Sequence, residues 1–210
     1  MGLLLFLSAG TWRWPQAWAF LFELGALSLA VGLWLLRHDP ALLQERLSSP
    51  VQAGQKRWDQ AGMLGLCVFW CAWTVLIALD ARRFHWSSMA APWNWAGAAG
   101  IALSVYAAYR TFRENSFAAP VVKLQRERGH RVVSTGPYRL VRHPMYTGAL
   151  FAFFGIPLLL GSWWGVVLAP VLCIAVGVRA VLEERVLETG LDGYAEYKAA
   201  VHYRLVPFVW

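Results

Sequence analysis

The sequence predicts an all-α, polytopic integral membrane protein with about five transmembrane helices, the last two forming a helical hairpin. Of its 210 residues, 58% are hydrophobic and 15% are charged, compared with about 45–50% and roughly 25% in an average soluble domain. The hydrophobic residues lie in blocks close to the roughly 20 residues that a helix needs to cross a bilayer. The net charge of +7 comes mainly from the segments between these blocks. That pattern sets membrane topology, so we expect no nucleic-acid partner.

The first transmembrane helix is expected at Gln16–Leu36, directly after a group of tryptophans that is typical of the membrane interface. It contains one acid, Glu23, which either marks a functional position inside the membrane or pairs within the helix bundle. Met1–Gly10 is apolar, but it is too short to cross a bilayer and has no basic region before it. We therefore expect a half-helix or the remnant of a longer span there, and no cleaved signal peptide.

A polar segment follows at residues 37–59, punctuated by proline and glycine. It predicts a short surface helix at 41–47, with Asp39 as the residue that caps its N-terminus. The second transmembrane helix is then expected at Ala61–Leu79, where the sequence is again continuously apolar.

The third span is expected at Trp93–Tyr109, where Gly97 and Gly100 would let a neighbouring helix pack closely. The last apolar tract, Thr147–Leu182, is too long for one crossing at about 1.5 Å per residue. We divide it into a helical hairpin that turns near Gly161–Gly165, because glycine and proline gather there.

The tail beyond Glu183 is polar, and residues 191–204 predict an amphipathic surface helix. We expect one membrane domain over residues 1–210. Within it, residues 1–109 would supply the N-terminal spans and residues 110–210 the catalytic, cofactor-binding part.

Basic residues concentrate in the polar segments 37–59 and 110–143 and in the tail, so all three should face the cytoplasm, with the N-terminus outside. The three cysteines have no His or carboxylate at metal-ligand spacing, and we expect no metal site. The sequence leaves the oligomeric state open.

The densest chemistry lies in the segment GHRVVSTGPYRLVRHPMYTG, residues 129–148. Its histidines, tyrosines and arginines would be costly near a membrane unless they line a wet cavity or bind a ligand. Its glycines permit close approach of the backbone to a ligand, and Val132–Val133 is expected to be extended. Such a loop suits a flat heterocycle with a polar or zwitterionic tail. The alternative is a basic loop that contacts anionic lipid headgroups.

A second polar cluster, Arg179 with Glu183 and Glu184, lies at the end of the last apolar tract. Arg179 and Glu183 are four residues apart and share a helix face, which allows either a common site or a mutual ion pair. Glu184 points about 100° away from Glu183 and is the weaker candidate.

The pattern GHxxVxxGPYxxxRHPxYxG, followed by RxxxEE and then YxxYKxxV, resembles the isoprenylcysteine carboxyl methyltransferase family and its bacterial relatives. The broader group includes phospholipid methyltransferases. The resemblance covers roughly Lys123–Val201. It implies an S-adenosylmethionine-dependent methyltransferase, multi-pass in the bacterial inner membrane, whose cofactor site faces the cytoplasm.

The resemblance also implies roles for individual residues. The cofactor pocket would be lined by Lys123, Gln125, His130, Arg131, Val132, Val133, Tyr138, His143, Pro144, Met145, Tyr146 and Glu183. Arg179 would face the acceptor, and Glu183 or Glu184 would take part in the reaction. Two departures stand out: eukaryotic relatives carry Gln where Lys123 stands, with Gln125 nearby, and often Phe-Gly where residues 191–192 are Leu-Asp.

The acceptor is expected to be a lipophilic or membrane-associated molecule. A carboxylate needs no base, and Arg179 would orient it. An amine would first lose a proton to a carboxylate such as Glu183 or Glu184. A thiol is a third possibility.

Two other functions fit parts of the sequence. One is an NADPH-dependent membrane reductase of the sterol-reductase type, against which the lack of a phosphate-binding glycine fingerprint argues. The other is a non-catalytic membrane protein that binds lipid at the same pocket. Turnover with a panel of acceptors distinguishes both from a methyltransferase.

Overall fold

The computed structural model describes residues 1–49, 51–52 and 54–210, and in these ranges it contains helices and no strand. The chain divides into two compact units, each built from three separate segments. Unit 1 comprises Met1–Leu29, Leu64–Tyr106 and Gly148–Ala175. Unit 2 comprises Ala30–Met63, Ala107–Thr147 and Val176–Trp210. The predicted all-α class is confirmed.

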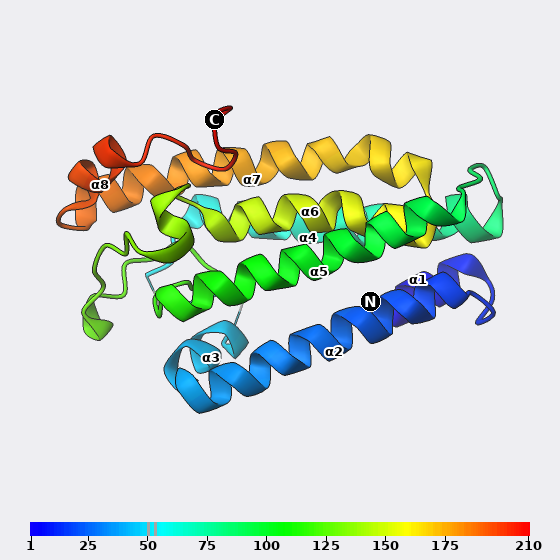
Figure 1. Cartoon of the computed structure of the whole chain (residues 1–210), viewed down its shortest axis with the longest axis horizontal. Helices are drawn as coiled ribbons and strands as arrows, with labels where there is room; N and C mark the ends of the chain where they lie inside the picture. Colours follow the sequence, from blue (N-terminus) through cyan, green and yellow to red (C-terminus); the bar gives the residue numbers. More distant parts are fainter. Residues whose placement is uncertain (50, 53) are drawn as a thin grey trace. The chain divides into compact units, whose positions relative to one another are not determined.

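The described residues form long helices together with several short ones (Figure 1). The α-helices are α1 (Gly2–Ala9), α2 (Pro15–His38), α3 (Pro40–Leu47), α4 (Arg57–Ala78), α5 (Ala91–Glu114), α6 (Pro144–Leu160), α7 (Trp163–Gly190) and α8 (Tyr194–Ala200). A π-helical turn, η1 (Leu79–Arg83), continues α4, and two 3-10 turns, η2 (Arg126–Arg128) and η3 (Gly136–Arg139), lie in the polar loop. Short α3 begins as predicted: the Leu42 N–H donates to Asp39 Oδ1 over 2.9 Å, and a proline follows the cap.

Three helical segments among the described residues are long and apolar enough to cross a membrane: Pro15–His38, Arg57–Arg83 and Trp163–Gly190. They confirm a polytopic membrane protein. The shorter α6 is also apolar. The third predicted span forms the 24-residue helix α5, which lies outside this apolar set. Its sequence is rich in alanine and glycine rather than in large hydrophobic residues.

Within unit 1, α5 and α6 pack with their backbones in contact. A Cβ atom added to Gly97 would lie 2.2 Å from the backbone nitrogen of Leu159, and one added to Gly155 would lie 2.8 Å from the carbonyl oxygen of Gly97. Gly100 faces Phe151 and Gly155 in the same way. The predicted role of Gly97 and Gly100 in close packing is therefore confirmed.

The predicted hairpin is also present in unit 1. α6 ends at Leu160, and α7 begins two residues after Gly161, which has a φ of 88° that favours glycine. Buried Asp80 of η1 fixes this turn, because its Oδ2 accepts hydrogen bonds from the hydroxyls of Ser162 (2.5 Å) and Ser87 (2.8 Å).

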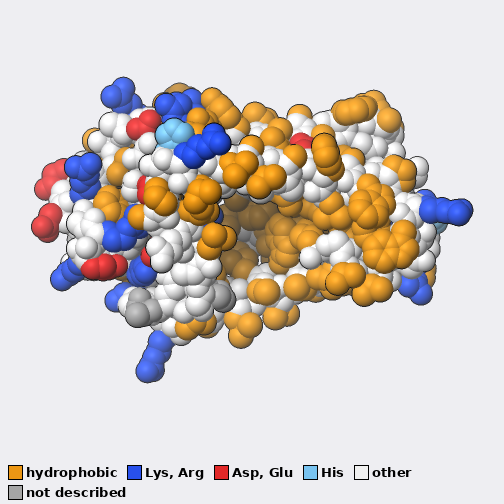
Figure 2. Space-filling model, turned by 90° about the horizontal axis from the view of Figure 1, so that it is seen from below, with side chains coloured by type: hydrophobic (Ala, Val, Ile, Leu, Met, Phe, Trp, Pro, Cys, Tyr) orange, Lys and Arg blue, Asp and Glu red, His pale blue; other side chains and the backbone are white. Residues whose placement is uncertain are grey.

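Unit 2 is organised around two groups of apolar side chains. Leu35, Leu42, Phe112 and Ala118 form one group, which joins α2, α3 and α5. Tyr194, Tyr197 and Val201 form the other, with Val132, Tyr138 and Leu187 packed against them. Figure 2 shows a surface with many hydrophobic side chains, on which most of the visible Asp and Glu side chains gather in one region together with Lys and Arg.

Candidate active site

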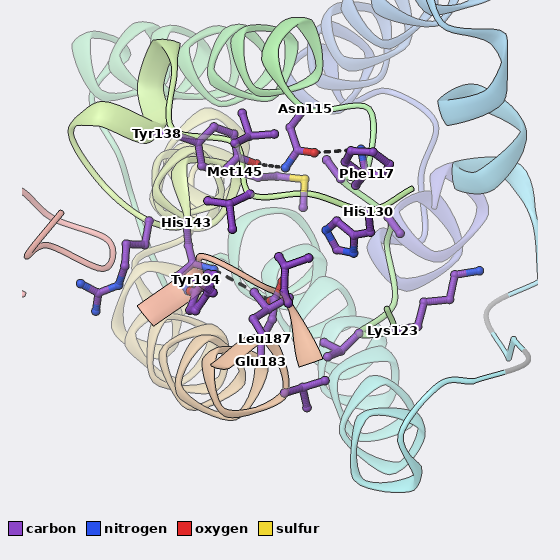
Figure 3. Close-up of a pocket in the computed structure, with 18 of the residues that line it drawn as sticks. Asn115, Phe117, Lys123, His130, Tyr138, His143, Met145, Glu183, Leu187 and Tyr194 are labelled. Atoms are coloured by element: carbon purple, nitrogen blue, oxygen red, sulfur yellow. Dashed lines mark hydrogen bonds and ion pairs between the residues drawn. The ribbon is translucent and has the colours of Figure 1, made fainter. Parts of the chain in front are cut away.

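Unit 2 contains a cavity with an empty volume of about 860 Å³, part of which opens to solvent. Its walls come from the loop that follows α5, the start of α6, the end of α7, and α8 (Figure 3). Of the residues predicted for the site, the lining includes Lys123, His130, Arg131, Val132, Val133, Tyr138, His143, Pro144, Met145, Tyr146, Arg179 and Glu183. Gln125 and Glu184 do not appear in the lining. The structure thus brings two segments that are distant in sequence to one cavity.

Glu183 places a carboxylate in this cavity. Its side chain is 26% exposed, and its Oε2 accepts a hydrogen bond of 2.7 Å from the Tyr146 hydroxyl. His143 Nδ1 lies 3.9 Å from the same oxygen, and the imidazole stacks on the Tyr146 ring. Figure 3 shows the side chains of His130, Met145 and Glu183 directed toward the same space. The carboxylate is therefore oriented by its neighbours yet accessible to a ligand.

Arg179 lines the cavity one helical turn before Glu183, but its carboxylate partner is Asp59 of α4. Arg179 Nε donates to Asp59 Oδ1 over 2.9 Å, and Nη2 donates to the carbonyl oxygen of Pro120 over 2.7 Å. The guanidinium also lies 5.8 Å from the centre of the Tyr146 ring. Arg179 and Glu183 therefore both line the cavity, and the carboxylate that pairs with Arg179 is Asp59 rather than Glu183.

Asp59 is a residue that the sequence did not single out. It is 1% exposed, and besides Arg179 it accepts hydrogen bonds from the Gln55 side chain and from the Val122 N–H, each over 2.9 Å. It binds one edge of the guanidinium, Nε, while Pro120 binds Nη2. Nothing in a lone aspartate after a basic run indicates an arginine 120 residues further on.

Glu184, in contrast, lies behind the cavity wall. It is 2% exposed and accepts hydrogen bonds from Arg142 Nε (2.7 Å) and Arg204 Nε (2.9 Å), and His143 Nε2 lies 3.2 Å from it. Because adjacent helix positions differ by about 100°, Glu184 faces this buried cluster while Glu183 faces the cavity. The expectation that Glu184 reaches the reacting groups is corrected on this geometry.

Arg142 links the same cluster to the last residues of the chain. Its Nη1 donates to the carbonyl oxygens of Val201 (2.6 Å) and His202 (2.8 Å). The backbone continues the pairing: the Arg142 N–H donates to Tyr203, and the His143 N–H donates to Arg204. A buried carboxylate between two guanidinium groups thus fixes the position of His143.

Gln125 and Lys123 differ from what the family pattern implied. Gln125 is fully buried, with its amide donating to the Phe117 carbonyl (2.8 Å) and its Oε1 accepting from Arg128 (2.5 Å), so it stabilises the loop. Lys123 borders the cavity, but its ammonium group lies 2.8 Å from Glu45 of α3. In Figure 3 that ammonium group points away from the middle of the cavity.

The loop after α5 forms one wall of the cavity, to which it contributes aromatic side chains and main-chain groups. The centres of the His130 and Phe117 rings lie 4.7 Å apart, and burial is the main reason that the pKa of His130 is lowered, which favours the neutral imidazole. Asn115, another residue that sequence reasoning missed, donates to the Tyr138 hydroxyl over 2.7 Å. Within the described ranges, the backbone groups of Val132 and Val133 have no hydrogen-bond partner.

Helix α8 closes the cavity on the side of the tail. Tyr194 and Tyr197 are buried and line it, and burial raises the pKa of both hydroxyls. The Tyr197 hydroxyl donates to the Tyr138 carbonyl over 2.9 Å, which joins α8 to the loop. Their neighbours in the lining on α7 are the apolar Val186 and Leu187.

Residues 93–191 match a family model described as phospholipid methyltransferase, and a search of curated proteins found no match. The matched range runs from α5 to the end of α7, and it contains the cavity loop, Arg179 and Glu183. The match supports a membrane methyltransferase. It is consistent with the isoprenylcysteine carboxyl methyltransferase family, and it confirms that this chain resembles the phospholipid methyltransferase-like group.

Proposed function

We propose that the protein is an S-adenosylmethionine-dependent methyltransferase that acts on a lipophilic or membrane-associated acceptor. The observation that carries the proposal is the accessible carboxylate of Glu183 in a cavity with aromatic walls and free main-chain groups. When bound, S-adenosylmethionine would supply an electrophilic methyl group on a cationic sulfonium.

The residues of the cavity fit such a cofactor. Glu183 offers the negative charge that an ammonium group and a sulfonium require. Val132 and Val133 offer main-chain donors and acceptors, as a purine edge requires, and the rings of His130 and Tyr138 offer flat faces.

Transfer of a methyl group is a displacement at carbon: the nucleophilic atom of the acceptor bonds to the methyl carbon as the carbon–sulfur bond breaks. Residues assist such a step mainly by alignment and by exclusion of water. Tyr146 and His143 hold the Glu183 carboxylate in one orientation. The apolar side chains of Val186 and Leu187, with Tyr194, keep water from that part of the cavity.

Arg179 favours an acceptor that carries an anionic oxygen. With Nε and Nη2 held by Asp59 and Pro120, the Nη1 end can bind a carboxylate or phosphate oxygen from the cavity side. A carboxylate acceptor would react without a base. An amine on a phospholipid headgroup, or a thiol, would first give its proton to Glu183. Glu184 is unsuited to that role, since its oxygens are held by Arg142 and Arg204.

We further propose that the protein lies in the inner membrane of a bacterium, with the cavity on the cytoplasmic side. Unit 2, which holds the cavity, contains the basic segments that the positive-inside rule assigns to the cytoplasm, among them Arg37, Arg46 and Arg57.

The test is transfer of a labelled methyl group from S-adenosylmethionine, with detergent-purified protein and an acceptor panel of phospholipids, lipophilic carboxylic acids and thiols. Glu183→Gln should abolish the transfer. The matched control is Glu188→Gln, because Glu188 lies on the same helix and pairs with Lys198 at the surface. Transfer that Glu183→Gln leaves unchanged would contradict the proposed role of the cavity.

A further inference from the structure

We propose that residues 206–210, the apolar turn that ends the chain, lie in the interface of the lipid bilayer and anchor one wall of the cavity to the membrane. The sequence of this turn is Val-Pro-Phe-Val-Trp, which has no charged side chain. Phe208 is 88% exposed and Val209 is 78% exposed. The inference concerns how unit 2 meets the membrane and does not depend on the methyl-transfer reaction.

The position of the turn on α7 indicates lipid as its partner. In Figure 1 the last residues run back from α8 along α7. A Cβ atom added to Gly177 would lie 3.3 Å from the Trp210 ring, so this ring rests directly on the helix backbone. Gly177 lies within the candidate span Trp163–Gly190, and its neighbour Val178 is exposed. A group in contact with a spanning helix is within reach of lipid.

Hydrogen bonds within the chain hold the backbone of the turn. The N–H groups of Leu205 and Val206 donate to the Trp210 carbonyl, and those of Val209 and Trp210 donate to the Val206 carbonyl. Pro207 has no N–H to satisfy. Main-chain groups that enter lipid need such internal partners. An exposed turn in water has no comparable need.

Phe208 adds a second indication. Its φ of 63° lies in the left-handed region, which is strained for a bulky residue. The ring meets Tyr203 at a centroid distance of 5.4 Å but is otherwise exposed, so few contacts within the chain compensate for this conformation. Insertion of the ring among lipid chains would supply the missing burial.

The charged residue next to the turn has the position expected at an interface. The Arg204 guanidinium lies 5.0 Å from the centre of the Trp210 ring, and its Nε donates to Glu184. Arginine and tryptophan together are typical of the boundary between headgroups and acyl chains. Because Glu184 also binds Arg142 and His143, contact of the turn with lipid is linked to the wall of the cavity.

The test is quenching of a fluorophore on single cysteines. Phe208→Cys and, separately, Val209→Cys are made in a chain whose three native cysteines are replaced, labelled with an environment-sensitive dye, and reconstituted into vesicles of equal parts phosphatidylethanolamine and phosphatidylglycerol. Ile174→Cys, exposed on α7 within the span, is the lipid control, and Ala195→Cys, exposed on α8 beside Asp192 and Glu196, is the water control. Nitroxide-labelled lipid and aqueous iodide are the two quenchers.

We expect the dyes at positions 208 and 209 to be quenched by nitroxide lipid, as the dye at position 174 is, and to be protected from iodide relative to position 195. Quenching by iodide to the extent seen at position 195 would overturn the proposal. Protection from both quenchers would also overturn it, because a second copy of the chain would then cover the turn. Two labelled positions keep the test decisive if one variant fails to fold.

Discussion

Glu183 and Glu184 are adjacent in sequence, yet one binds the Tyr146 hydroxyl in the cavity and the other is buried between Arg142 and Arg204. We therefore expect substitutions of these two neighbouring carboxylates to differ in their effect on stability. Glu184→Gln should lower the free energy of unfolding by about 3 kcal/mol, because it leaves buried guanidinium groups without their counter-charge. Glu183→Gln should leave stability nearly unchanged, since the side chain is partly exposed. Thermal unfolding of both variants in detergent measures this difference, and equal melting temperatures would contradict it.

Arg179 and Asp59 form an ion pair between α7 and α4 that a double-mutant cycle can measure. Asp59→Ala should lower the free energy of unfolding by about 3 kcal/mol, because it leaves a partly buried guanidinium unpaired. In an Arg179→Met background the same change should cost less, with a coupling free energy of about 1–3 kcal/mol. Unfolding midpoints of the wild type, the two single variants and the double variant give the value. Additive effects would show that the pair contributes nothing specific.

Gly97 should tolerate no side chain. A Cβ atom there would overlap the backbone of Leu159, which cannot move aside as a flexible side chain can. Gly97→Ala should therefore prevent the close packing of α5 on α6 and lower the melting temperature or the yield of folded protein. Gly25→Ala is the matched control, since nothing lies within 4 Å of the added atom. Alanine there should be neutral or stabilising by up to about 1 kcal/mol through helix propensity.

We expect the titration of His130 to lower the stability of the folded protein in mild acid. Burial lowers its pKa below the ordinary value of 6.5, so the folded protein binds this proton less readily than the unfolded chain. Above the pKa of this histidine in the unfolded chain, its titration does not lower the free energy of unfolding. As pH falls from there through the lower pKa of the folded state, the free energy of unfolding decreases. His130→Gln should reduce the difference in melting temperature between about pH 7.5 and about pH 5, the range over which an ordinary histidine titrates. An unchanged difference would assign the acid sensitivity to other groups.

The positions of the helices and of the hairpin turn were predictable, because they depend on the length of the apolar segments and on turn and capping residues nearby in the sequence. The blocks at Gln16–Leu36 and Thr147–Leu182 indicated spanning helices, and glycine placed the turn of the hairpin. Asp39 followed by a proline indicated the start of α3. Each of these features is determined by neighbouring residues, so a single sequence is enough to locate it.

The partners inside the site were less predictable, for a physical reason. Helix periodicity correctly put Arg179 and Glu183 on one face and turned Glu184 away. It says nothing of Asp59, which comes from another helix, or of Arg204, which comes from the tail. In the irregular loop after α5 the family resemblance implied that Gln125 lines the cofactor pocket, but the backbone turns its amide toward Phe117. Side-chain direction in such a loop depends on tertiary packing, which local patterns do not encode.

The central claim is that the cavity around Glu183 binds S-adenosylmethionine, and calorimetry with its product, S-adenosylhomocysteine, tests it most directly. Detergent-purified protein should bind this ligand saturably, with NADPH as a control that does not bind. Affinity should fall by about tenfold or more in Glu183→Gln, as expected when a charged hydrogen bond is lost, and it should be retained in Glu188→Gln. Binding of NADPH without binding of S-adenosylhomocysteine would contradict the account and identify the cavity as the site of a reductase.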